Sequence, residues 1–266
     1  MNVYSWEMRH NMKSTMIWTV VLIVLLIMYA SVYPSMVKDV ELISRVMKLM
    51  PRAFLRIFGL EDFDLTNILH YLVTISSIYV TLLGSVFSAL LVVKLVAKEE
   101  SEKTAEFLLS KPLGRKSVLA QKLLAIFSSI LMLDAILSLA SFFVTSYFGS
   151  ESLDQSRFWL FWASQILLHI TVSSIVLCFI CFSKRQDSAV SLSIGIVFVL
   201  YIFSIIAKLT EKAKLLVYFT PFYYSDGVRI VKYGSIEPIF LLLHFVLILA
   251  SLSVSFIVYS RKDIYV

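Results

Sequence analysis

Six stretches of the chain are apolar and long enough to cross a lipid bilayer as helices. They cover residues 17–33, 71–93, 123–148, 158–182, 188–207 and 239–259. A hydrocarbon core of about 30 Å requires roughly 20 residues of α-helix. The strands of a membrane β-barrel alternate over about ten residues, whereas these runs are longer and continuous. The pattern therefore predicts an all-α integral membrane protein whose six transmembrane helices form a single domain over residues 1–266.

The composition supports this class. Of the 266 residues, 59% are hydrophobic and 16% are charged, whereas about a quarter of the residues of a soluble domain are charged. A soluble domain and a disordered chain are thus both excluded. The net charge is +6, but no run of basic residues is interleaved with aromatic residues as a nucleic-acid groove requires. We interpret the excess of basic residues as a signal for orientation in the membrane.

An even number of spans places both termini on one side of the membrane. Lys184 and Arg185 lie in a very short loop, and Arg261 and Lys262 directly follow the last span. Basic residues in short loops and beside spans favour the cytoplasmic side. Both termini are therefore predicted to be cytoplasmic, and residues 34–70 and 208–238 to be extracellular.

The segments before and between the spans carry their own patterns. Residues 1–16 place Tyr4, Met8 and Met12 on one helical face, which predicts an interfacial helix; a frayed polar leader is the alternative. In residues 34–70, apolar positions recur every three or four residues, Pro51 interrupts them, and Gly59 follows a second short run. We expect two short amphipathic helices there.

Aromatic residues are concentrated in residues 218–227, within the second extracellular segment. They fit either a belt at the membrane interface or a re-entrant turn packed against the spans. We favour the belt, which is the simpler of the two interpretations.

The loop between the second and third spans is the most informative. Residues 98–111 have a helical pattern with acidic side chains at Glu99, Glu102 and Glu106, and Pro112 stops the helix. Anionic lipid would repel so acidic a helix. We therefore expect this helix to bind a protein partner; a solvated connecting helix is the alternative.

Several polar residues lie within the predicted spans. Small residues in the second span share one face and suit either helix packing or a polar path, with packing favoured: Ser77, Thr81, Gly84, Ser85 and Ser88. Asp134, His169 and His244 are ionisable residues in apolar surroundings and mark functional candidates. A structural hydrogen bond is the favoured interpretation for each of the three. The candidate path-lining residues are Ser77, Thr81, Ser85 and Asp134.

The motifs of common enzyme classes are missing from the sequence. No Gly is followed by Lys, so there is no P-loop. The four histidines lie far apart, no H-E-x-x-H motif occurs, and no G-x-S-x-G elbow is present. We therefore predict no catalytic residue, cofactor or metal in this chain, and transport driven by a separate ATPase. The alternatives are a membrane-embedded enzyme that uses Asp134, His169 and Gln165, or a non-transporting immunity or scaffold protein.

Three stretches resemble the permease subunits of type-2 ABC exporters, the ABC-2 permease family. The first reads Glu100-x-x-x-Thr104-x-Glu106-x-Leu108-Leu109-Ser110-x-Pro112-x-x-Arg115, followed by Lys122. The others are Leu49-Met50-Pro51 with Phe54, Leu55, Phe58 and Gly59, and Thr220-Pro221-Phe222-Tyr223 with Gly234. One departure is Lys103, where the family commonly has Gly, which indicates a more continuous helix in this chain.

This resemblance implies a role for each part of the chain. Residues 98–111 would be the coupling helix that contacts the ATPase, with residues 183–188 as a minor contact. The implied coupling residues are Glu99, Glu100, Glu102, Thr104, Glu106, Phe107, Leu108, Pro112 and Arg115. Two permease copies, or one copy with a sister permease, would pair with two ATPase subunits that bind ATP and Mg. Spans two and five would line the transport path. The expected location of the protein is a cell membrane, such as the bacterial plasma membrane.

The sequence gives less information about the cargo. Small polar residues mixed with many Phe and Tyr suit an amphipathic peptide, an antibiotic or another hydrophobic compound. Peptide export is therefore the expected use of such a permease.

Overall fold

The computed structural model describes residues 2–61, 64, 66–97, 114–149, 153–183 and 188–261, and every regular element in these ranges is a helix. Six helices are long and apolar enough to cross a membrane. They are α1 (Val3–Lys38), α4 (Ile68–Val92, continued by the π-helix η1, Val93–Ala97), α7 (Arg115–Phe148), α8 (Gln155–Phe182), α9 (Ala189–Leu209) and α12 (Pro238–Arg261). The six predicted spans and the all-α class are confirmed.

Polar side chains fix the starts of three of the long helices. Asn2 accepts a hydrogen bond from Tyr4 N, Asn67 accepts from Leu69 N, and Asp154 accepts from Arg157 N. Each satisfies a backbone donor that the helix itself cannot pair. The apolar runs thus become helices whose boundaries are set by local capping.

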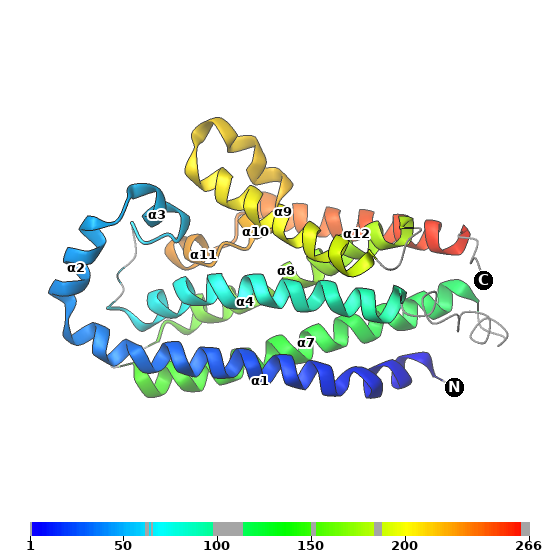
Figure 1. The fold of residues 1–266 in the computed structure, drawn as a ribbon, viewed down its shortest axis with the longest axis horizontal. Coiled ribbons are helices and arrows are strands. Elements are labelled where there is room, and N and C mark those ends of the chain that lie inside the picture. Colours follow the sequence, from blue (N-terminus) through cyan, green and yellow to red (C-terminus); the bar gives the residue numbers. More distant parts are fainter. Residues whose placement is uncertain are drawn as a thin grey trace.

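The long helices run alongside one another, and both termini lie at the same end of the bundle, here called the terminal end (Figure 1). Helix α7 packs on α1, while α8 packs on both α4 and α12. In the most apolar window of α4, 72% of the residues are buried, against 22% for α9 and 11% for α12. The core is therefore centred on α4 and α8, and α9 and α12 leave large apolar faces open.

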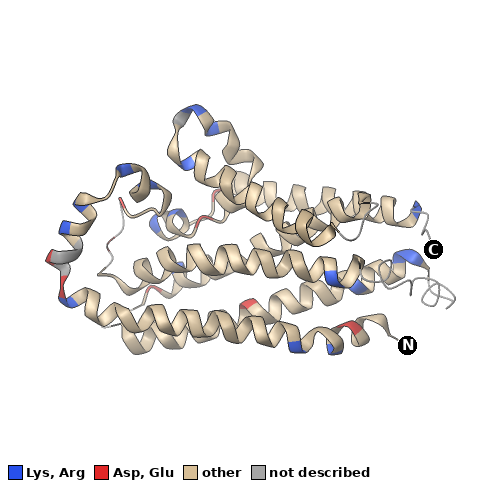
Figure 2. Ribbon diagram, viewed as in Figure 1, with Lys and Arg blue, Asp and Glu red and all other residues tan. Residues whose placement is uncertain are grey.

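Charged residues gather at the two ends of the bundle, and the middle of the helices is almost free of them (Figure 2). The end opposite the termini carries α2 (Val40–Leu49), α3 (Arg52–Ile57) and α11 (Gly227–Tyr233). This distribution is expected when the central band faces hydrocarbon, because a charge there is costly.

Residues 3–16 form the first turns of α1 and continue into the first span without a break. The separate interfacial helix predicted for residues 1–16 is therefore absent. Met12 is 37% exposed, whereas Glu7, Asn11 and Thr15 are buried on the face that carries Thr19. Because helix α1 packs along α7, its polar stripe points into the protein. Of the three residues on the predicted apolar face, Met12 points outward, whereas Tyr4 and Met8 are partly buried against the core.

The two short helices expected in residues 34–70 are confirmed as α2 and α3, with Pro51 between them. Gly59 follows α3 in the left-handed conformation, with φ of +65°, which glycine adopts without the penalty of a side chain. A Cβ at this position would lie 2.5 Å from Val228 Cγ1. Gly59 therefore also allows the chain to approach α11 closely.

The segment 208–238 folds into η2 (Glu211–Phe219), α10 (Pro221–Tyr224) and α11. Phe222 and Tyr224 are buried, and the Tyr224 hydroxyl donates a hydrogen bond to Tyr218 O. Only the flanking residues, such as Phe219 and Tyr233, remain exposed. The favoured interpretation as a belt was thus wrong for the central part of the segment, because α10 and α11 pack against α4, α8 and α9.

Candidate functional site

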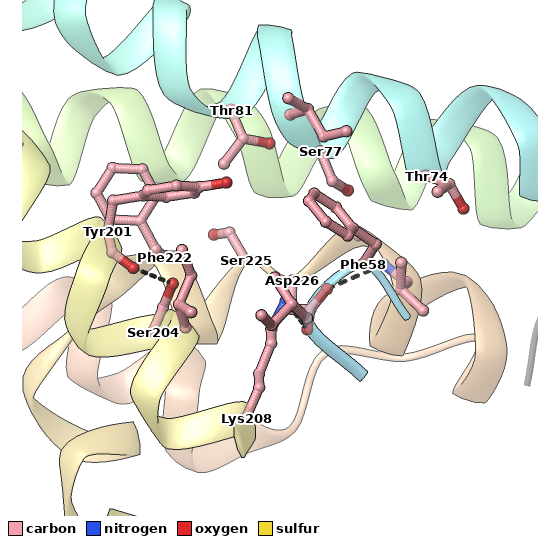
Figure 3. A pocket seen from close by; sticks show the side chains of 15 residues that line it. Phe58, Thr74, Ser77, Thr81, Tyr201, Ser204, Lys208, Phe222, Ser225 and Asp226 are labelled. Atoms are coloured by element: carbon pink, nitrogen blue, oxygen red, sulfur yellow. Dashed lines mark hydrogen bonds and ion pairs between the residues drawn. The ribbon is translucent and has the colours of Figure 1, made fainter. Parts of the chain in front are cut away.

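A polar pocket lies where α4 faces α9 and the short helices α10 and α11, with the end of α3 as one wall (Figure 3). The side chains labelled in the figure come from α4, α9 and α10, from the residue after α3 and from the turn before α11: Phe58, Thr74, Ser77, Thr81, Tyr201, Ser204, Lys208, Phe222, Ser225 and Asp226. The cavity volume is about 30 Å³, and one water molecule needs about 10–15 Å³ measured in this way. The pocket is therefore closed to anything larger than a few waters in this conformation.

The small-residue face of the second span is divided by the fold. Ser77 and Thr81 line the pocket, as two of the four candidate path-lining residues. Ser85 is buried and donates to Thr81 O at 2.7 Å, and Asp134 is buried on α7. Neither of these two lines the pocket. The same helix thus contributes both to a polar surface and to helix packing.

Hydroxyl groups supply most of the polarity of the α4 wall. Ser77 donates to Val73 O at 2.7 Å, and Ser204 on α9 donates to Tyr201 O at 2.7 Å. The Thr74 hydroxyl is buried and has no hydrogen-bond partner among the residues that the structure describes. A buried hydroxyl without a partner costs free energy, so Thr74 is suited to a water or to a polar group of a bound molecule.

An ion pair joins α9 to α11 at the pocket. Lys208 Nζ lies 2.8 Å from Asp226 Oδ2, and the two side chains are 21% and 5% exposed. Asp226 also caps α11, because its Oδ1 accepts from Val228 N at 3.2 Å. Removing one partner of a mostly buried pair is costly, because the other charge is then left without a partner. The pair fixes the last turn of α9 against α11.

A buried network behind the pocket connects four helices. The Thr81 hydroxyl donates to Gln165 Oε1 at 2.8 Å, and Gln165 Nε2 donates to Ser225 O at 3.2 Å. Gln165, on α8, thereby joins α4 to the turn between α10 and α11. Fully paired polar groups in an apolar interior hold their neighbours in one arrangement.

His244, on α12, extends this network. Its Nδ1 lies 2.7 Å from the Thr171 hydroxyl and its Nε2 lies 3.0 Å from the Ser225 hydroxyl. Those hydroxyls also lie within hydrogen-bond distance of backbone carbonyls, at Leu167 and Ser164. A neutral imidazole donates at one nitrogen and accepts at the other, so one hydroxyl must turn its proton toward the ring.

Asp134 and His169 form a second buried pair, between α7 and α8. His169 Nδ1 lies 2.9 Å and 3.0 Å from the two carboxylate oxygens, and both side chains are fully buried. The other ring nitrogen faces Gly84 and has no partner among the described residues. Gln165, grouped with this pair in the enzyme alternative, instead bonds Thr81 and Ser225. The pair joins two helices inside the protein, as the favoured interpretation expects.

The coupling segment lies mostly outside the described residues. Glu99, Glu100, Glu102, Thr104, Glu106, Phe107, Leu108 and Pro112 fall in the range 98–113, and 184–187 of the minor contact are also outside. Arg115 begins α7. The segment leaves the described chain after Ala97 and returns at Gly114, and both positions are at the terminal end (Figure 1).

The sequence analysis does not predict two buried ion pairs, Lys208 with Asp226 and Lys122 with Glu7. One signal was available for the second pair. Glu7, Asn11 and Thr15 recur every four residues, which places them on one face of a helix. The partner of such a face depends on how the helices pack, and the sequence does not reveal that.

The helices and the pocket together define an all-helical, multi-pass membrane protein with a polar cavity between its second and fifth spans. A family model described as ABC-2 family transporter protein matches residues 1–264, so the chain belongs to that family. No curated protein gives a match. The chain is therefore a transporter permease, the membrane component of an ABC transporter, a class in which an ATPase accompanies the permease.

Proposed function

We propose that this permease is part of an ATP-driven exporter for an amphipathic or hydrophobic compound, and that a separate ATPase subunit drives it through residues 98–111. The observation that carries the proposal is the polar pocket between α4 and α9, in a chain that belongs to a transporter family. A transport path needs polar groups that are shielded from lipid, and this pocket provides them.

The closed pocket gives the proposal its mechanism. Movement of α9 away from α4 would open the space between Thr81 and Tyr201, and it would require the ion pair of Lys208 and Asp226 to separate. Helix α9 suits such a movement because most of its surface is not packed within this chain. The bundle would then alternate between two arrangements, each stabilised by different contacts.

The lining of the pocket supports the choice of cargo. Hydroxyl groups of Ser77, Thr81 and Ser204 lie beside the rings of Tyr201 and Phe222. Such a surface offers hydrogen bonds and apolar contact together, as sites for small molecules usually do. An amphipathic peptide, an antibiotic or another hydrophobic compound matches it better than a sugar phosphate or a metal ion would.

The coupling helix is proposed to lie on the cytoplasmic side, with both termini, in a cell membrane. Its acidic face at Glu99, Glu102 and Glu106 would meet basic groups of the ATPase, which binds ATP and Mg. A second permease, either a copy of this chain or a sister protein, would cover part of the open apolar faces of α9 and α12. This chain would carry out no covalent chemistry.

The first experiment tests the coupling face. The chain is co-expressed with a candidate ABC ATPase, and the complex is purified and reconstituted. Charge reversal of Glu102→Lys with Glu106→Lys should lower the amount of cargo moved per ATP, because the acidic face would repel its basic partner. Glu41→Lys is a matched control, since Glu41 is exposed on α2 at the opposite end of the bundle. Wild-type coupling in the double variant would refute the assignment of this face.

The second experiment tests the cargo. Amphipathic peptides, hydrophobic antibiotics, sugar phosphates and metal ions are compared for stimulation of ATP hydrolysis by the reconstituted complex. The first two classes should stimulate hydrolysis, and Thr81→Val with Ser77→Ala should weaken the effect. Stimulation by sugar phosphates alone would contradict the proposed cargo, and the lack of any ATPase that co-purifies with the chain would contradict the exporter.

A further inference from the structure

Lys122 is fully buried and lies at the junction of three helices at the terminal end of the bundle. Its Nζ donates a hydrogen bond to Leu95 O in η1 and lies 3.8 Å from Glu7 Oε1 on α1. The Glu7 side chain is 6% exposed. A buried ammonium needs such partners, since it has lost its contact with water.

The partners of Lys122 are themselves positioned by local contacts. Asn11 Nδ2 donates to Glu7 Oε2 at 3.2 Å and to Glu7 O at 2.9 Å, which holds the carboxylate on the inner face of α1. Leu95 belongs to a π-helical turn, a rare geometry that is frequent at functional sites. A carbonyl oxygen has two lone pairs, so Leu95 O can accept the lysine in addition to a helical bond.

The residues of this contact lie on either side of the segment 98–113 in the sequence. Leu95 lies just before Ala97, where the chain enters the segment 98–113. Lys122 lies seven residues after Arg115, where α7 begins, or about 10 Å along the helix at 1.5 Å per residue. The hydrogen bond therefore joins the two flanks of that segment, and the ion pair attaches both flanks to α1.

We propose that Glu7, Lys122 and the Leu95 carbonyl form a clamp that makes the two flanks of the coupling segment move as one body with α1. Lys122 is a positioning residue for energy coupling. This inference rests on the proposed function, because it assumes that an ATPase moves the segment 98–113. Without the clamp, a push on the segment would shift η1 and α7 separately, and part of the movement would not reach α1.

The first test needs no ATPase. The chain is placed in lipid nanodiscs, and backbone hydrogen exchange is followed in peptides that cover η1. Lys122→Met keeps a long side chain but removes the donor and the charge, so exchange in η1 should be faster by about tenfold or more. Lys116→Met is the matched control, since Lys116 is exposed on the first turn of the same helix. Equal exchange rates of η1 in the wild-type protein, Lys122→Met and Lys116→Met would overturn the clamp.

The second test uses the complex with the ATPase. A dansyl-labelled amphipathic peptide that stimulates hydrolysis serves as the probe, and the peptide moved per ATP is measured. Lys122→Met and Glu7→Gln should each lower this ratio, Lys122→Arg should retain more of it, and Lys116→Met should leave it unchanged. A purely structural role would reduce the amount of assembled complex without changing the ratio, and that result would overturn the assignment.

Two further comparisons keep the tests decisive. If Lys122→Met does not insert into the membrane, Glu7→Gln replaces it in the transport measurement, because that variant keeps the lysine and its bond to Leu95. In the exchange experiment Glu7→Gln is then followed in peptides from the first turns of α1, where exchange should be faster because the ion pair to Lys122 is lost. The double variant should be no worse than the more affected single variant, since two residues that act as one unit are not additive. If the wild-type chain binds no ATPase, the proposed function fails, while the exchange experiment still decides whether the clamp exists.

Discussion

Replacing Gly84 with alanine should destabilise the protein, although alanine favours helices. A Cβ at position 84 would lie 2.5 Å from His169 Cε1 and Nε2, and ordinary contacts begin at 3.4 Å. The ring would have to shift by about 0.9 Å, which would disturb its 2.9 Å hydrogen bond to Asp134.

The size of the effect follows from three contributions. A lost hydrogen bond to a charged group costs about 1.5–3 kcal/mol, and overpacking a buried site costs about 1–3 kcal/mol. The higher helix propensity of alanine returns about 1 kcal/mol. We therefore expect Gly84→Ala to lower the free energy of unfolding by about 1.5–5 kcal/mol.

The assay is reversible unfolding in bicelles, followed by tryptophan fluorescence. Gly195→Ala is the control, because Gly195 lies on α9 and an added Cβ there would meet nothing within 4 Å. That variant should be neutral or slightly stabilised. In a His169→Ala/Asp134→Asn background, Gly84→Ala should cost little. If Gly84→Ala is as stable as Gly195→Ala in the wild-type background, the inferred contact between Gly84 and His169 is refuted.

Three further predictions concern the pocket and its surroundings. Lys208→Met should loosen α9 from Asp226 and increase labelling by a thiol reagent of a cysteine introduced into the pocket by Ser77→Cys; unchanged labelling would show that the ion pair does not hold the pocket closed. Gly59→Ala should cost about 1–3 kcal/mol in thermal unfolding, because its φ is positive and Val228 blocks a Cβ; unchanged stability would contradict this. Gln165→Leu should cost about 1–3 kcal/mol by leaving buried groups unpaired, and a wild-type unfolding curve would argue against the network.

Local patterns were sufficient to predict most of the fold. Apolar length alone located the six spans, because a helix that crosses a bilayer must be apolar over about 20 residues. Pro51 and Gly59 act through their own backbone restrictions, so their effect on α2 and α3 could be seen in the sequence. These features depend on a few neighbouring residues and not on tertiary contacts.

The face of α1 could not be predicted in the same way. The pattern placed Tyr4, Met8 and Met12 on one face but did not show which face of α1 packs on the protein; in a soluble protein it would be the apolar face. Lipid is as apolar as a protein core, so a span can turn its polar residues inward instead. Thr15 and Thr19 show how this is achieved, because their hydroxyls donate to carbonyls one turn earlier in α1.

The candidate site was predicted in part, since Ser77 and Thr81 do line the pocket. Ser85 and Asp134 share the polarity of those residues but lie elsewhere: Ser85 is buried and donates to Thr81 O, and Asp134, on α7, pairs with His169. The aromatic and charged walls come from α9, α10 and α11. The contact of these three helices with α4 depends on long-range packing, which cannot be read from a single sequence.

The unequal burial of the long helices has a consequence for how fast their sequences can change in evolution. Helix α12 has few buried residues, among them His244 and Ser255, whereas most of α4 is enclosed. The positions on α12 that face lipid, and not a second permease, need only remain apolar, so substitutions among Leu, Ile, Val and Phe should accumulate at them almost freely. The side chains of α4 must keep their shape as well as their apolar character, so substitutions should accumulate there much more slowly.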